Sequence, residues 1–262
     1  MIYQLALFGH PVKHSQSPQI HQEFARQFGL DIKYQLIDVT TDELHRRVHQ
    51  FFDQGGHGAN VTVPHKQAVM TVTDQLTERA TQAGAVNTLY LKDNQLWGDN
   101  TDGIGLVKDL QQKNIDLRNK RILIFGAGGA VHGVLPALLQ QNPGSIDIYN
   151  RSQAKAEQLA EKYDLITSLT KPALLTGTVK YELIINGTGC GHAGISPPIP
   201  HNLPPKTVAY DLSYGAVTEP FMHACQLAGL KHVFAGLGML RQQAAYAFKQ
   251  WFDRYPNVNK LK

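Results

Sequence analysis

The stretch RILIFGAGGAVHGVLPALL, residues 121–139, decides the fold of the larger part of this chain. Residues 122–125 form an unbroken apolar run, which is typical of a strand buried on both faces of a parallel sheet. Gly126, Gly128 and Gly129 follow, and glycines allow a tight turn in which the backbone approaches a ligand. Apolar residues then recur at helical spacing from Val131 to Leu139. The order strand, glycine turn, helix predicts a dinucleotide-binding βαβ unit.

The start of the helix that this pattern predicts is a candidate phosphate site, because free backbone N–H groups and the positive end of the helix dipole favour an anion. The residues involved are Gly126, Ala127, Gly128, Gly129 and Ala130. Val131 stands where the strict fingerprint has its third glycine, and a plain turn is the alternative. A second strand at 146–149 favours the nucleotide site. Pro136 lies deep in the helix and predicts a bend.

Composition describes a globular protein with room for two modest domains in 262 residues. Hydrophobic residues make up 42% and charged residues 18%, and no apolar run approaches the ~20 residues of a membrane span. The N-terminus lacks the pattern of a signal peptide, and Cys190 and Cys225 form no disulfide framework. We expect a cytoplasmic protein that does not associate with membranes.

The charged residues favour small anions over nucleic acid as partners. The net charge is +4 and the pI is about 8.9, with Lys and Arg spread along the chain instead of gathered in a stripe. Twelve histidines invite a metal hypothesis, and His45 and His49 have the i,i+4 spacing of a ligand pair. Since there is no HExxH motif and no third ligand nearby, a solvated helix face is the better interpretation, and no metal is predicted.

The N-terminal segment places two hydroxyls beside a predicted helix. A strand at 2–8 is followed by HSQSP, from His14 to Pro18, and then by a helix with apolar residues Ile20, Phe24 and Phe28. Ser17 before Pro18 is typical of an N-cap, whereas Ser15 has no such structural role. The two hydroxyls can also form a carboxylate cradle with the helix N-terminus. Both interpretations stay open at this point.

Strands at 33–39 and 58–63, with a helix at 42–52 between them, predict a mostly parallel α/β sheet. Pro64, His65 and Lys66 follow the second strand at its carboxyl end, where such sheets place ligands. If Pro64 starts a short helix, Lys66 lies in its first turn. Lys66 is either simply solvent-exposed or functional.

A hairpin is predicted next, with strands at 85–91 and 95–98 around the turn residues Asp93 and Asn94, and with Asn87 inside its first strand. Thr101 and Asp102 precede a helix that carries Ile104, Leu106, Val107 and Leu110. Asp102 is thus either a cap or first-turn acid, or a functional group near the domain junction.

Six strands are expected from Arg121 to Phe234, the later ones near 166 and at 182–186, 207–211 and 232–234, which makes a full doubly wound Rossmann domain. Helices are expected at 152–163 and after Thr218 with Pro220. A last helix at 237–252 has an apolar stripe and no strand after it, so we expect it to pack back on the first domain.

The end of the second Rossmann strand indicates the cofactor. NAD enzymes place a carboxylate there, but this chain has Asn150, followed by Arg151, Ser152 and Lys155. The planar guanidinium of Arg151, the hydroxyl of Ser152 and the ammonium of Lys155 suit the 2′-phosphate of NADP. A polar helix start in which Ser152 caps and both cations are solvated is the alternative.

Eight motifs occur in one order along nearly the whole chain: HSxSP at 14–18, NVTVPHK at 60–66, GAVNT at 84–88, GDNTDG at 98–103, GAGGA at 126–130, NRS at 150–152, YDLSY at 210–214 and GLGMLRQQA at 236–244. In these motifs the chain resembles the family of NADP-dependent, AroE-like shikimate dehydrogenases. The resemblance implies reversible reduction of 3-dehydroshikimate to shikimate with NADPH, between a substrate domain (1–103 and 237–262) and a Rossmann domain (104–236).

The resemblance also implies roles for individual residues. Lys66 and Asp102 would be the catalytic pair. Ser15, Ser17 and Tyr214 would hold the substrate carboxylate, and Thr62, Lys66, Asn87, Asp102 and Gln243 the ring hydroxyls. Thr188, Gly236 and Met239 would join the residues above in binding NADP(H). The substrate is a small molecule, and the protein would act as a monomer or homodimer.

Two departures from the family pattern affect this expectation. The loop at 187–191 carries more glycine than is usual, with His192 after it, which leaves the packing of the nicotinamide less defined than phosphate binding. Ser152 replaces a commoner threonine and keeps its hydroxyl. The rival functions are a quinate/shikimate dehydrogenase of broader range and a non-catalytic dinucleotide-binding sensor. Retention of both Lys66 and Asp102 argues against the sensor.

Overall fold

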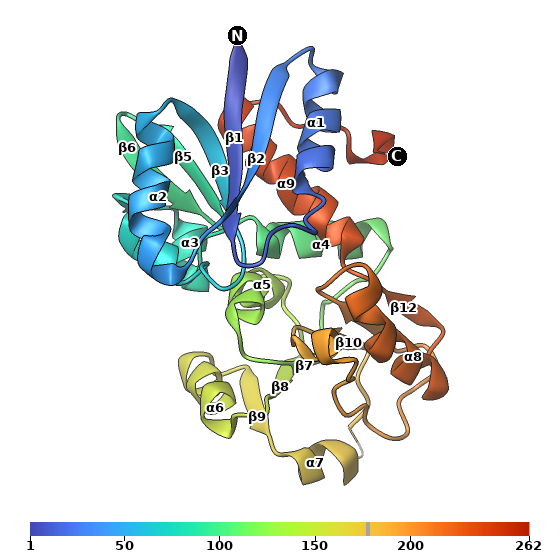
Figure 1. Ribbon diagram of the computed structural model, residues 1–262. Helices are drawn as coiled ribbons and strands as arrows, with labels where there is room; N and C mark the ends of the chain where they lie inside the picture. Colours follow the sequence, from blue (N-terminus) through green and yellow to red (C-terminus); the bar gives the residue numbers. More distant parts are fainter. Residues whose placement is uncertain (177–178, 262) are drawn as a thin grey trace. The chain divides into compact units, whose positions relative to one another are not determined.

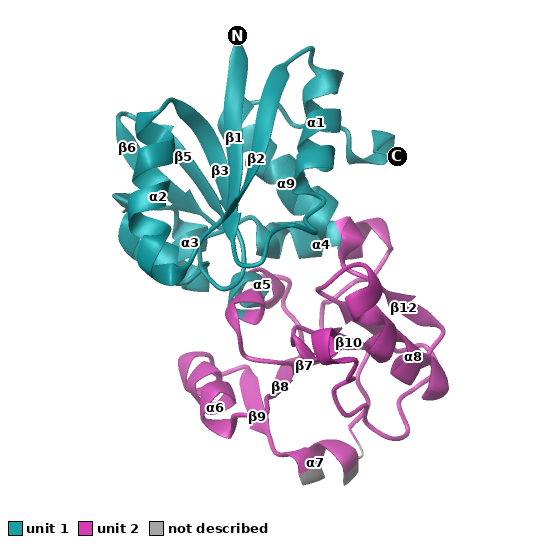
Figure 2. Cartoon of the chain, in the orientation of Figure 1, with its two compact units in different colours: residues 1–109, 132–136, 239–262 teal, residues 110–131, 137–238 magenta. Residues whose placement is uncertain are grey.

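The computed structural model describes residues 1–176 and 179–261. The chain divides into two compact units, shown in different colours in Figure 2. The first unit comprises Met1–Asp109, His132–Pro136 and Met239–Lys262, and the second comprises Leu110–Val131 and Ala137–Gly238. The sequence-based boundaries lie after residues 103 and 236. The assignment of substrate binding to one domain and dinucleotide binding to the other stays a prediction.

A six-stranded sheet forms the centre of the first unit, with strand order β2-β1-β3-β5-β6-β4 (Figure 1). The strands are β1 (Ile2–Gly9), β2 (Asp31–Asp38), β3 (Gly56–Val61), β4 (Gln75–Leu76), β5 (Thr88–Lys92) and β6 (Gln95–Asp99). Strands β1, β2 and β3 are parallel, β5 runs antiparallel to β3, and β6 runs antiparallel to β5. The carboxyl ends of β1, β3 and β6 therefore lie at one edge of the sheet, together with the start of β5.

The predicted hairpin is present as β5 and β6. Asp93 and Asn94 have φ of 53° and 58°, the left-handed conformation that a two-residue hairpin turn requires at both positions. The first strand begins at Thr88 and not at Ala85, so the prediction that Asn87 lies inside it was wrong. Ala85 and Val86 are apolar because they are buried in the segment that leads into the strand.

Helices cover both faces of this sheet, because side chains of successive strand residues point to opposite faces. Ala6 and Phe8 of β1 pack with Leu44, Val48 and neighbouring residues of α2 (Thr41–Asp53). Leu5 packs on the other face with α1 (Ser17–Gln27) and α9 (Leu237–Phe252). The expectation that the last helix returns to the first domain is confirmed, since Ala244, Ala247, Phe248 and Trp251 are buried in that cluster.

Short elements complete the first unit, and most were not predicted. A 3₁₀ turn, η1 (Ala68–Val72), and helix α3 (Glu78–Ala83) follow β3 and β4. The hydroxyl of Thr77 accepts a hydrogen bond from the Ala80 N–H at 3.3 Å and caps α3. Helix α4 (Asp102–Gln112) begins at Asp102, which is therefore a first-turn acid as one of the sequence interpretations has it. A last 3₁₀ turn, η4 (Val258–Lys260), follows α9.

The second unit holds an all-parallel sheet in the order β12-β11-β10-β7-β8-β9, which confirms the doubly wound Rossmann topology. Its strands are β7 (Arg121–Phe125), β8 (Ser145–Tyr149), β9 (Ile166–Leu169), β10 (Leu183–Asn186), β11 (Val208–Asp211) and β12 (His232–Phe234). Its helices are α5 (Gly129–Leu139), part of which belongs to the first unit, α6 (Gln153–Lys162), α7 (Lys171–Thr176) and α8 (Glu219–Leu227). Two 3₁₀ turns, η2 (Cys190–Ala193) and η3 (Ala216–Thr218), lie between β10 and α8. The bend expected at Pro136 stays a prediction, because the described helix continues through that residue.

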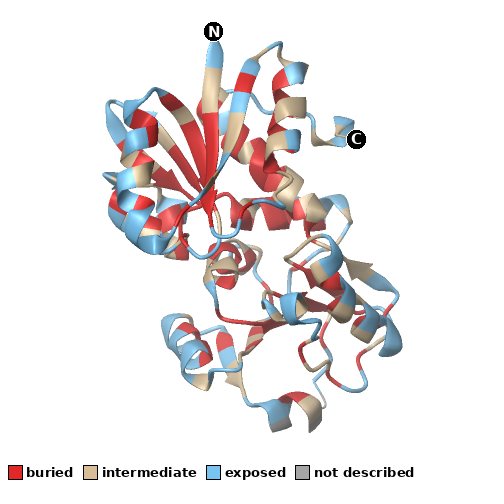
Figure 3. Ribbon diagram, in the orientation of Figure 1, coloured by how far each residue is buried: buried red, intermediate tan, exposed pale blue. Residues whose placement is uncertain are grey.

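Buried residues follow the strands of both sheets and the inner faces of the helices (Figure 3). In the second unit, Leu123 and Phe125 of β7 pack with Phe221 and Cys225 of α8. Within residues 1–176 and 179–261, no helix is long and apolar enough to cross a bilayer, and no three potential ligands are grouped as a metal site requires.

Candidate active site

The predicted catalytic residues come together at the sheet edge where β1, β3 and β6 end. Lys66 lies in the turn after β3, and Asp102 lies at the start of the helix after β6. The Lys66 Nζ atom is 2.6 Å from Asp102 Oδ2, and the two side chains are 15% and 5% exposed. At this burial the attraction is much stronger than between solvent-exposed charges, because little water screens it.

The turn that carries Lys66 is held at two points. The buried His65 ring donates through Nε2 to the Val39 carbonyl at 2.7 Å, and the Lys66 carbonyl accepts from the Val86 N–H at 2.7 Å. No helix starts at Pro64: residues 63–67 form a turn, and the 3₁₀ turn η1 begins at Ala68. The alternative that places Lys66 in a helical first turn was therefore wrong, and no helix dipole acts against its charge there.

Asn87 connects the carboxylate to its surroundings. Its Nδ2 donates to Asp102 Oδ1 at 2.9 Å, to Thr101 Oγ1 at 3.0 Å and to Gln243 Oε1 at 3.2 Å. Its Oδ1 accepts from the Thr101 N–H and from the Thr88 hydroxyl, both at 2.9 Å. Both oxygens of Asp102 thus have a partner, Lys66 at one and Asn87 at the other, and the carboxylate has one orientation.

The start of α4 is held by Asn100 and Asp99, which lie two and three residues before it. The Asn100 side chain accepts from the Asp102 N–H at 3.0 Å and donates to the Ala85 carbonyl at 2.9 Å. Asp99 is fully buried, with its carboxylate bonded by Arg79, by the Thr77 hydroxyl at 2.6 Å and by Gln250 at 3.3 Å. This network lies behind the site and holds the loop that presents Asp102.

Gln243 reaches the site from α9. Its Nε2 donates to the Leu240 carbonyl at 3.0 Å, which turns its Oε1 toward Asn87 and Thr101. Helix α4 passes so close that a Cβ on Gly105 would lie 2.7 Å from the Gln243 Cβ. Only glycine at 105 allows this approach.

The three predicted hydroxyls lie at the ends of β1 and β3 and at the start of α1. Thr62 donates its N–H to the Phe8 carbonyl at 2.9 Å, and its hydroxyl has no hydrogen-bond partner within the described residues. Ser17 is the first residue of α1 and Gln16 is the N-cap, so of the two interpretations of Ser17 the N-cap was wrong. Ser15 does have a structural role, because its Oγ accepts from the Ser17 N–H at 3.2 Å.

The glycine turn of the second unit has the shape of a phosphate cradle. Gly126 has φ of 104°, and its N–H donates to the Tyr149 carbonyl at 2.8 Å. A Cβ on Gly126 would lie 2.9 Å from the Gly187 carbonyl oxygen, so glycine is required for packing as well as conformation. In the described part of the chain a Cβ on Gly128 or Gly129 would point into open space, which leaves the start of α5 open to a ligand.

Cations follow β8 as predicted. Asn150 donates to the Ser152 carbonyl at 2.9 Å, and Arg151, Ser152 and Lys155 are exposed. Ser152 is the N-cap of α6 but its side chain makes no capping hydrogen bond. Arg151 and Lys155 form no ion pair in the part of the chain that the structure describes. These groups are thus available to an anion.

The loop after β10 is shaped by a buried pair. Asn186 Oδ1 accepts from the Thr188 N–H at 3.0 Å and its hydroxyl at 2.7 Å, and Asn186 Nδ2 donates to Asp211 Oδ2 at 2.8 Å. Burial raises the pKa of Asp211, against the hydrogen bonds that it accepts from Ser213 and Asn186. His192 is exposed in η2.

The remaining predicted residues are Tyr214 and Gly236 of the second unit and Met239 of the first. Tyr214 follows Ser213 and is half-buried. Gly236 donates its N–H to the Ser213 carbonyl at 2.7 Å, and Met239 in the first turn of α9 is buried. The roles predicted for Tyr214, Gly236 and Met239 stay predictions.

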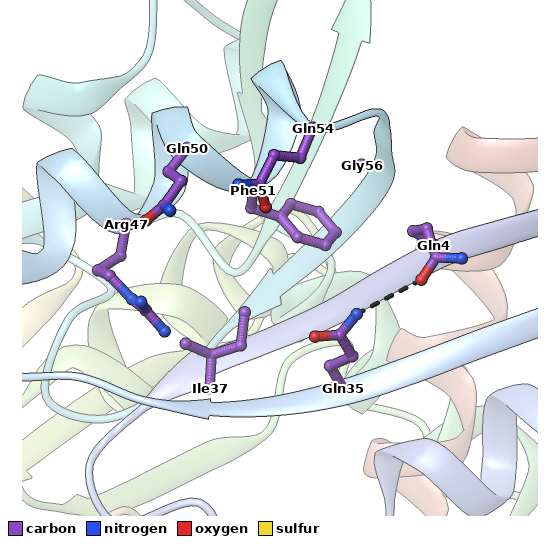
Figure 4. Close-up of a pocket in the computed structure, with 8 residues that line it drawn as sticks. All are labelled: Gln4, Gln35, Ile37, Arg47, Gln50, Phe51, Gln54 and Gly56. Atoms are coloured by element: carbon purple, nitrogen blue, oxygen red, sulfur yellow. Dashed lines mark hydrogen bonds between the residues drawn. The ribbon is translucent and has the colours of Figure 1, made fainter.

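A separate cavity of about 250 Å³ contains none of the predicted site residues (Figure 4). It lies between α2 and strands β1 to β3, and its walls are Gln4, Gln35, Ile37, Arg47, Gln50, Phe51, Gln54 and Gly56. His45 and His49 line an open hollow on the same helix, with ring centroids 4.6 Å apart.

Comparison with known proteins identifies the family. Family models match residues 7–89 as the shikimate dehydrogenase substrate binding domain and residues 109–197 as shikimate/quinate 5-dehydrogenase. The shikimate dehydrogenase (NADP(+)) of Aeromonas salmonicida (strain A449) is 46% identical over 260 residues, 97% of this chain and 94% of that protein. That of Cellvibrio japonicus (strain Ueda107) is 44% identical over 258 residues, 97% and 93% of the two chains. The chain belongs to the shikimate dehydrogenase family.

Two solved structures have the same fold as this chain. Shikimate 5-dehydrogenase from Thermus thermophilus, in complex with NADP(H) and shikimate, superposes with a TM-score of 0.87 at 30% identity, over 98% of this chain and 96% of that one. An Ael1 enzyme from Pseudomonas putida gives 0.90 at 34% identity, over 99% and 98%.

The structure also shows residues at this site that the sequence interpretation did not select. Thr101 bonds to both Asn87 and Gln243, and Asn60 donates to the Asn87 carbonyl at 3.2 Å while it accepts from the Tyr34 hydroxyl at 2.8 Å. Both lie inside motifs noted in the sequence, GDNTDG and NVTVPHK. A buried position for a polar residue next to a strand end is the signal that could have identified them.

Proposed function

We propose that this chain catalyses the reversible NADP-dependent interconversion of shikimate and 3-dehydroshikimate, with Lys66 and Asp102 as its catalytic pair. The observation that carries the proposal is the ion pair of 2.6 Å between Lys66 Nζ and Asp102 Oδ2. Asn87 donates a hydrogen bond to the other carboxylate oxygen of Asp102. A protein that only bound a dinucleotide would gain nothing from a half-buried lysine held in this way.

The pair supports proton transfer at the carbonyl oxygen. NADPH, when bound, supplies the hydride that converts the ketone carbon to an alcohol carbon. The Lys66 ammonium donates a hydrogen bond to the ketone oxygen and transfers its proton as negative charge develops there. In the reverse direction the neutral amine accepts the hydroxyl proton. Asp102 keeps the ammonium in place and accepts a hydrogen bond from a neighbouring substrate hydroxyl.

The surrounding polar groups fit a small hydroxylated carboxylic acid. Ser15 and Ser17 place two hydroxyls at the start of α1, where the helix dipole favours a carboxylate. Asn87 and Gln243 place two amides beside Asp102, and Thr62 has a hydroxyl without a hydrogen-bond partner in the described residues. These groups suit ring hydroxyls. Tyr214 is assigned to the substrate carboxylate on the family pattern alone.

The second unit fits NADP(H). The open start of α5 can receive the pyrophosphate, and Arg151, Ser152 and Lys155 can receive the 2′-phosphate in a place without a carboxylate. Thr188 and Met239 are assigned to the nicotinamide end, and Gly236 is assigned to the cofactor site. The shikimate dehydrogenases of Aeromonas salmonicida and Cellvibrio japonicus are named for NADP(+), which supports this choice. We assign the enzyme to the cytoplasm, as a monomer or homodimer.

The test is the initial rate of dinucleotide reduction at 340 nm with shikimate and with quinate, each with NADP⁺ and with NAD⁺. We expect turnover with shikimate and NADP⁺ to exceed the other three combinations. Comparable rates with quinate would instead establish a quinate/shikimate dehydrogenase, which the name of the second family model allows. No turnover in any combination, with NADPH binding retained in a fluorescence titration, would establish a sensor.

A further inference from the structure

Gly133 lies in the interior of helix α5 and contacts the carboxylate of Asp102. A Cβ built on Gly133 would lie 2.9 Å from Asp102 Oδ2, 3.2 Å from Asn100 Nδ2 and 3.3 Å from Asp102 Cβ. Real Cβ atoms do not approach other atoms to less than 3.0 Å, so something must move if a methyl group is added here. Residues 132–136 belong to the same compact unit as Asp102 and are drawn in the same colour in Figure 2.

The carboxylate cannot move away without losing a partner. Its Oδ2 is the atom that contacts Lys66 at 2.6 Å, and its Oδ1 accepts from Asn87. The backbone below it is held by Asn100, whose own amide is bonded to the Ala85 carbonyl. The atom nearest to the missing side chain of Gly133 is therefore the oxygen that holds the catalytic lysine.

Neither the backbone nor the helix explains a glycine at position 133. Gly133 is not among the glycines with positive φ, so an alanine can adopt its conformation. It occupies the middle of a helix of 11 residues, where glycine is a poorer helix former than alanine. The close approach to Asp102 and Asn100 is the feature that alanine would not allow.

We propose that Gly133 is a positioning residue for the catalytic pair: its lack of a side chain lets the α5 backbone close over Asp102 and fix the carboxylate against Lys66. This inference rests on the proposed function, since it concerns the same pair. Helix α5 begins at the glycine turn, and Gly133, about one turn later, limits the position of the Asp102 carboxylate.

Gly133→Ala separates positioning from a general structural role. The added methyl group moves Oδ2 and lengthens its contact with Lys66, so kcat/KM for shikimate should fall by roughly 10- to 100-fold. The glycine turn at 126–129 gains no contact, and the KM for NADP⁺ should stay within about twofold of the wild-type value. A helix that was simply damaged would weaken cofactor and substrate together, and that result, or full activity, would overturn the proposal.

A stability cycle tests the contact without any turnover. In the wild-type background Gly133→Ala should lower Tm, because the clash outweighs the gain in helix propensity. In an Asp102→Ala background Oδ2 is absent and only the approaches of 3.2 Å to Asn100 Nδ2 and 3.3 Å to the Cβ of residue 102 remain. The same substitution should then lower Tm by much less than in wild type, or raise it by up to about 2–4 °C. Equal effects in both backgrounds would overturn the proposal. If Asp102→Ala does not fold, the effect of Gly133→Ala on Tm can be measured in an Asp102→Ser background instead.

The two measurements also keep this inference distinct from the proposed function. If the wild-type protein oxidised neither shikimate nor quinate, the proposed function would fail. The stability cycle would still report whether Gly133 and Asp102 are coupled. If the enzyme is active and the cycle shows no coupling, Gly133 does not position the carboxylate.

Discussion

Each oxygen of the Asp102 carboxylate has its own donor, and this division determines what a single substitution does at the site. Lys66 bonds to Oδ2 and Asn87 to Oδ1, in a place that is 5% exposed. Removal of either donor leaves a buried charge without full compensation, which costs more than the bond itself contributed. Variants at Lys66 or Asn87 should therefore be checked for folding before their kinetics are interpreted.

Arg151 tests the choice of cofactor at the scale of one residue. Its guanidinium is exposed and forms no ion pair in the described part of the chain, so it can bond to a 2′-phosphate. A charged hydrogen bond of this kind contributes about 1.5–3 kcal/mol, and Arg151→Ala should raise the KM for NADP⁺ on the order of 10- to 100-fold. The KM for NAD⁺, which lacks that phosphate, should hardly change.

Arg118→Ala is the matched control, because it removes an equal charge from an exposed position of the same unit. It should leave both KM values unchanged. If Arg151→Ala raised the KM for NADP⁺ and for NAD⁺ by the same factor, Arg151 would not bind the 2′-phosphate.

Helix α9 is the element that joins the C-terminal segment of the chain to the candidate site. Trp251 anchors it: the ring packs directly against Gly58 of β3, and Nε1 donates to the Leu89 carbonyl at 3.1 Å. Gln243 lies on the same helix, two turns earlier. The position of Gln243 beside Asn87 therefore depends on packing at the far end of the helix.

Trp251→Ala should destabilise the protein by about 3–5 kcal/mol, the usual cost of removing a large buried side chain. Chemical denaturation measures this directly. If the fold survives, the KM for shikimate should rise because Gln243 is less well held. Leu227→Ala, at a position of α8 that is 76% exposed, should change the free energy of unfolding by less than about 0.5 kcal/mol. A Trp251 variant as stable as this control would contradict the anchoring role.

Elements with a long pattern could be predicted from the sequence, and short ones could not. Helix α9 follows from its apolar stripe, and β7 follows from an unbroken apolar run that ends at a glycine turn. Helix α3 has six residues, and β4 has two, too few for a period to show. Thr77 before Glu78 was a capping signal that could have revealed α3.

The sequence could not show which residues meet at the site, because these contacts join residues that are far apart in the chain. That Lys66 and Asp102 touch depends on β5 and β6 turning back on β3, so that three strand ends share one edge. Gly133 could not be selected from the sequence, because no residue near it in the chain indicates that Asp102 lies against it. The N-cap at Gln16 in place of Ser17 differs by one residue, which sequence patterns rarely resolve.

At the scale of the whole molecule, His21 links stability to pH. It is fully buried between aromatic rings, stacked on Tyr34 at 5.0 Å, and neither ring nitrogen has a hydrogen-bond partner within the described residues. Burial lowers the pKa of His21 to about 3, and the nearby Asn60 side chain opposes this only in part. The folded state therefore favours the neutral ring.

The sign of the effect follows from the lowered pKa. Above the ordinary value of 6.5 the ring is neutral in both states, and the stability is fully present. As pH falls from 6.5 toward 3, the unfolded chain takes up a proton that the folded chain excludes, and stability declines by up to about 1.4 kcal/mol per pH unit. His21→Phe should lose this dependence, so its unfolding free energy should diverge from wild type below pH 6.5. His45→Phe, on the surface, should follow wild type, and parallel curves for His21→Phe would contradict the account.

The catalytic pair is tested most directly by Lys66→Met, measured as kcat and KM for shikimate at saturating NADP⁺, with Lys108→Met on the exposed side of α4 as control. Methionine keeps the length of the side chain and removes the proton donor. We expect kcat to fall by roughly 10²–10⁴-fold while KM changes much less, and the control to match wild type. A variant with near-normal kcat and weakened binding of shikimate would show that Lys66 binds the substrate without taking part in the chemistry.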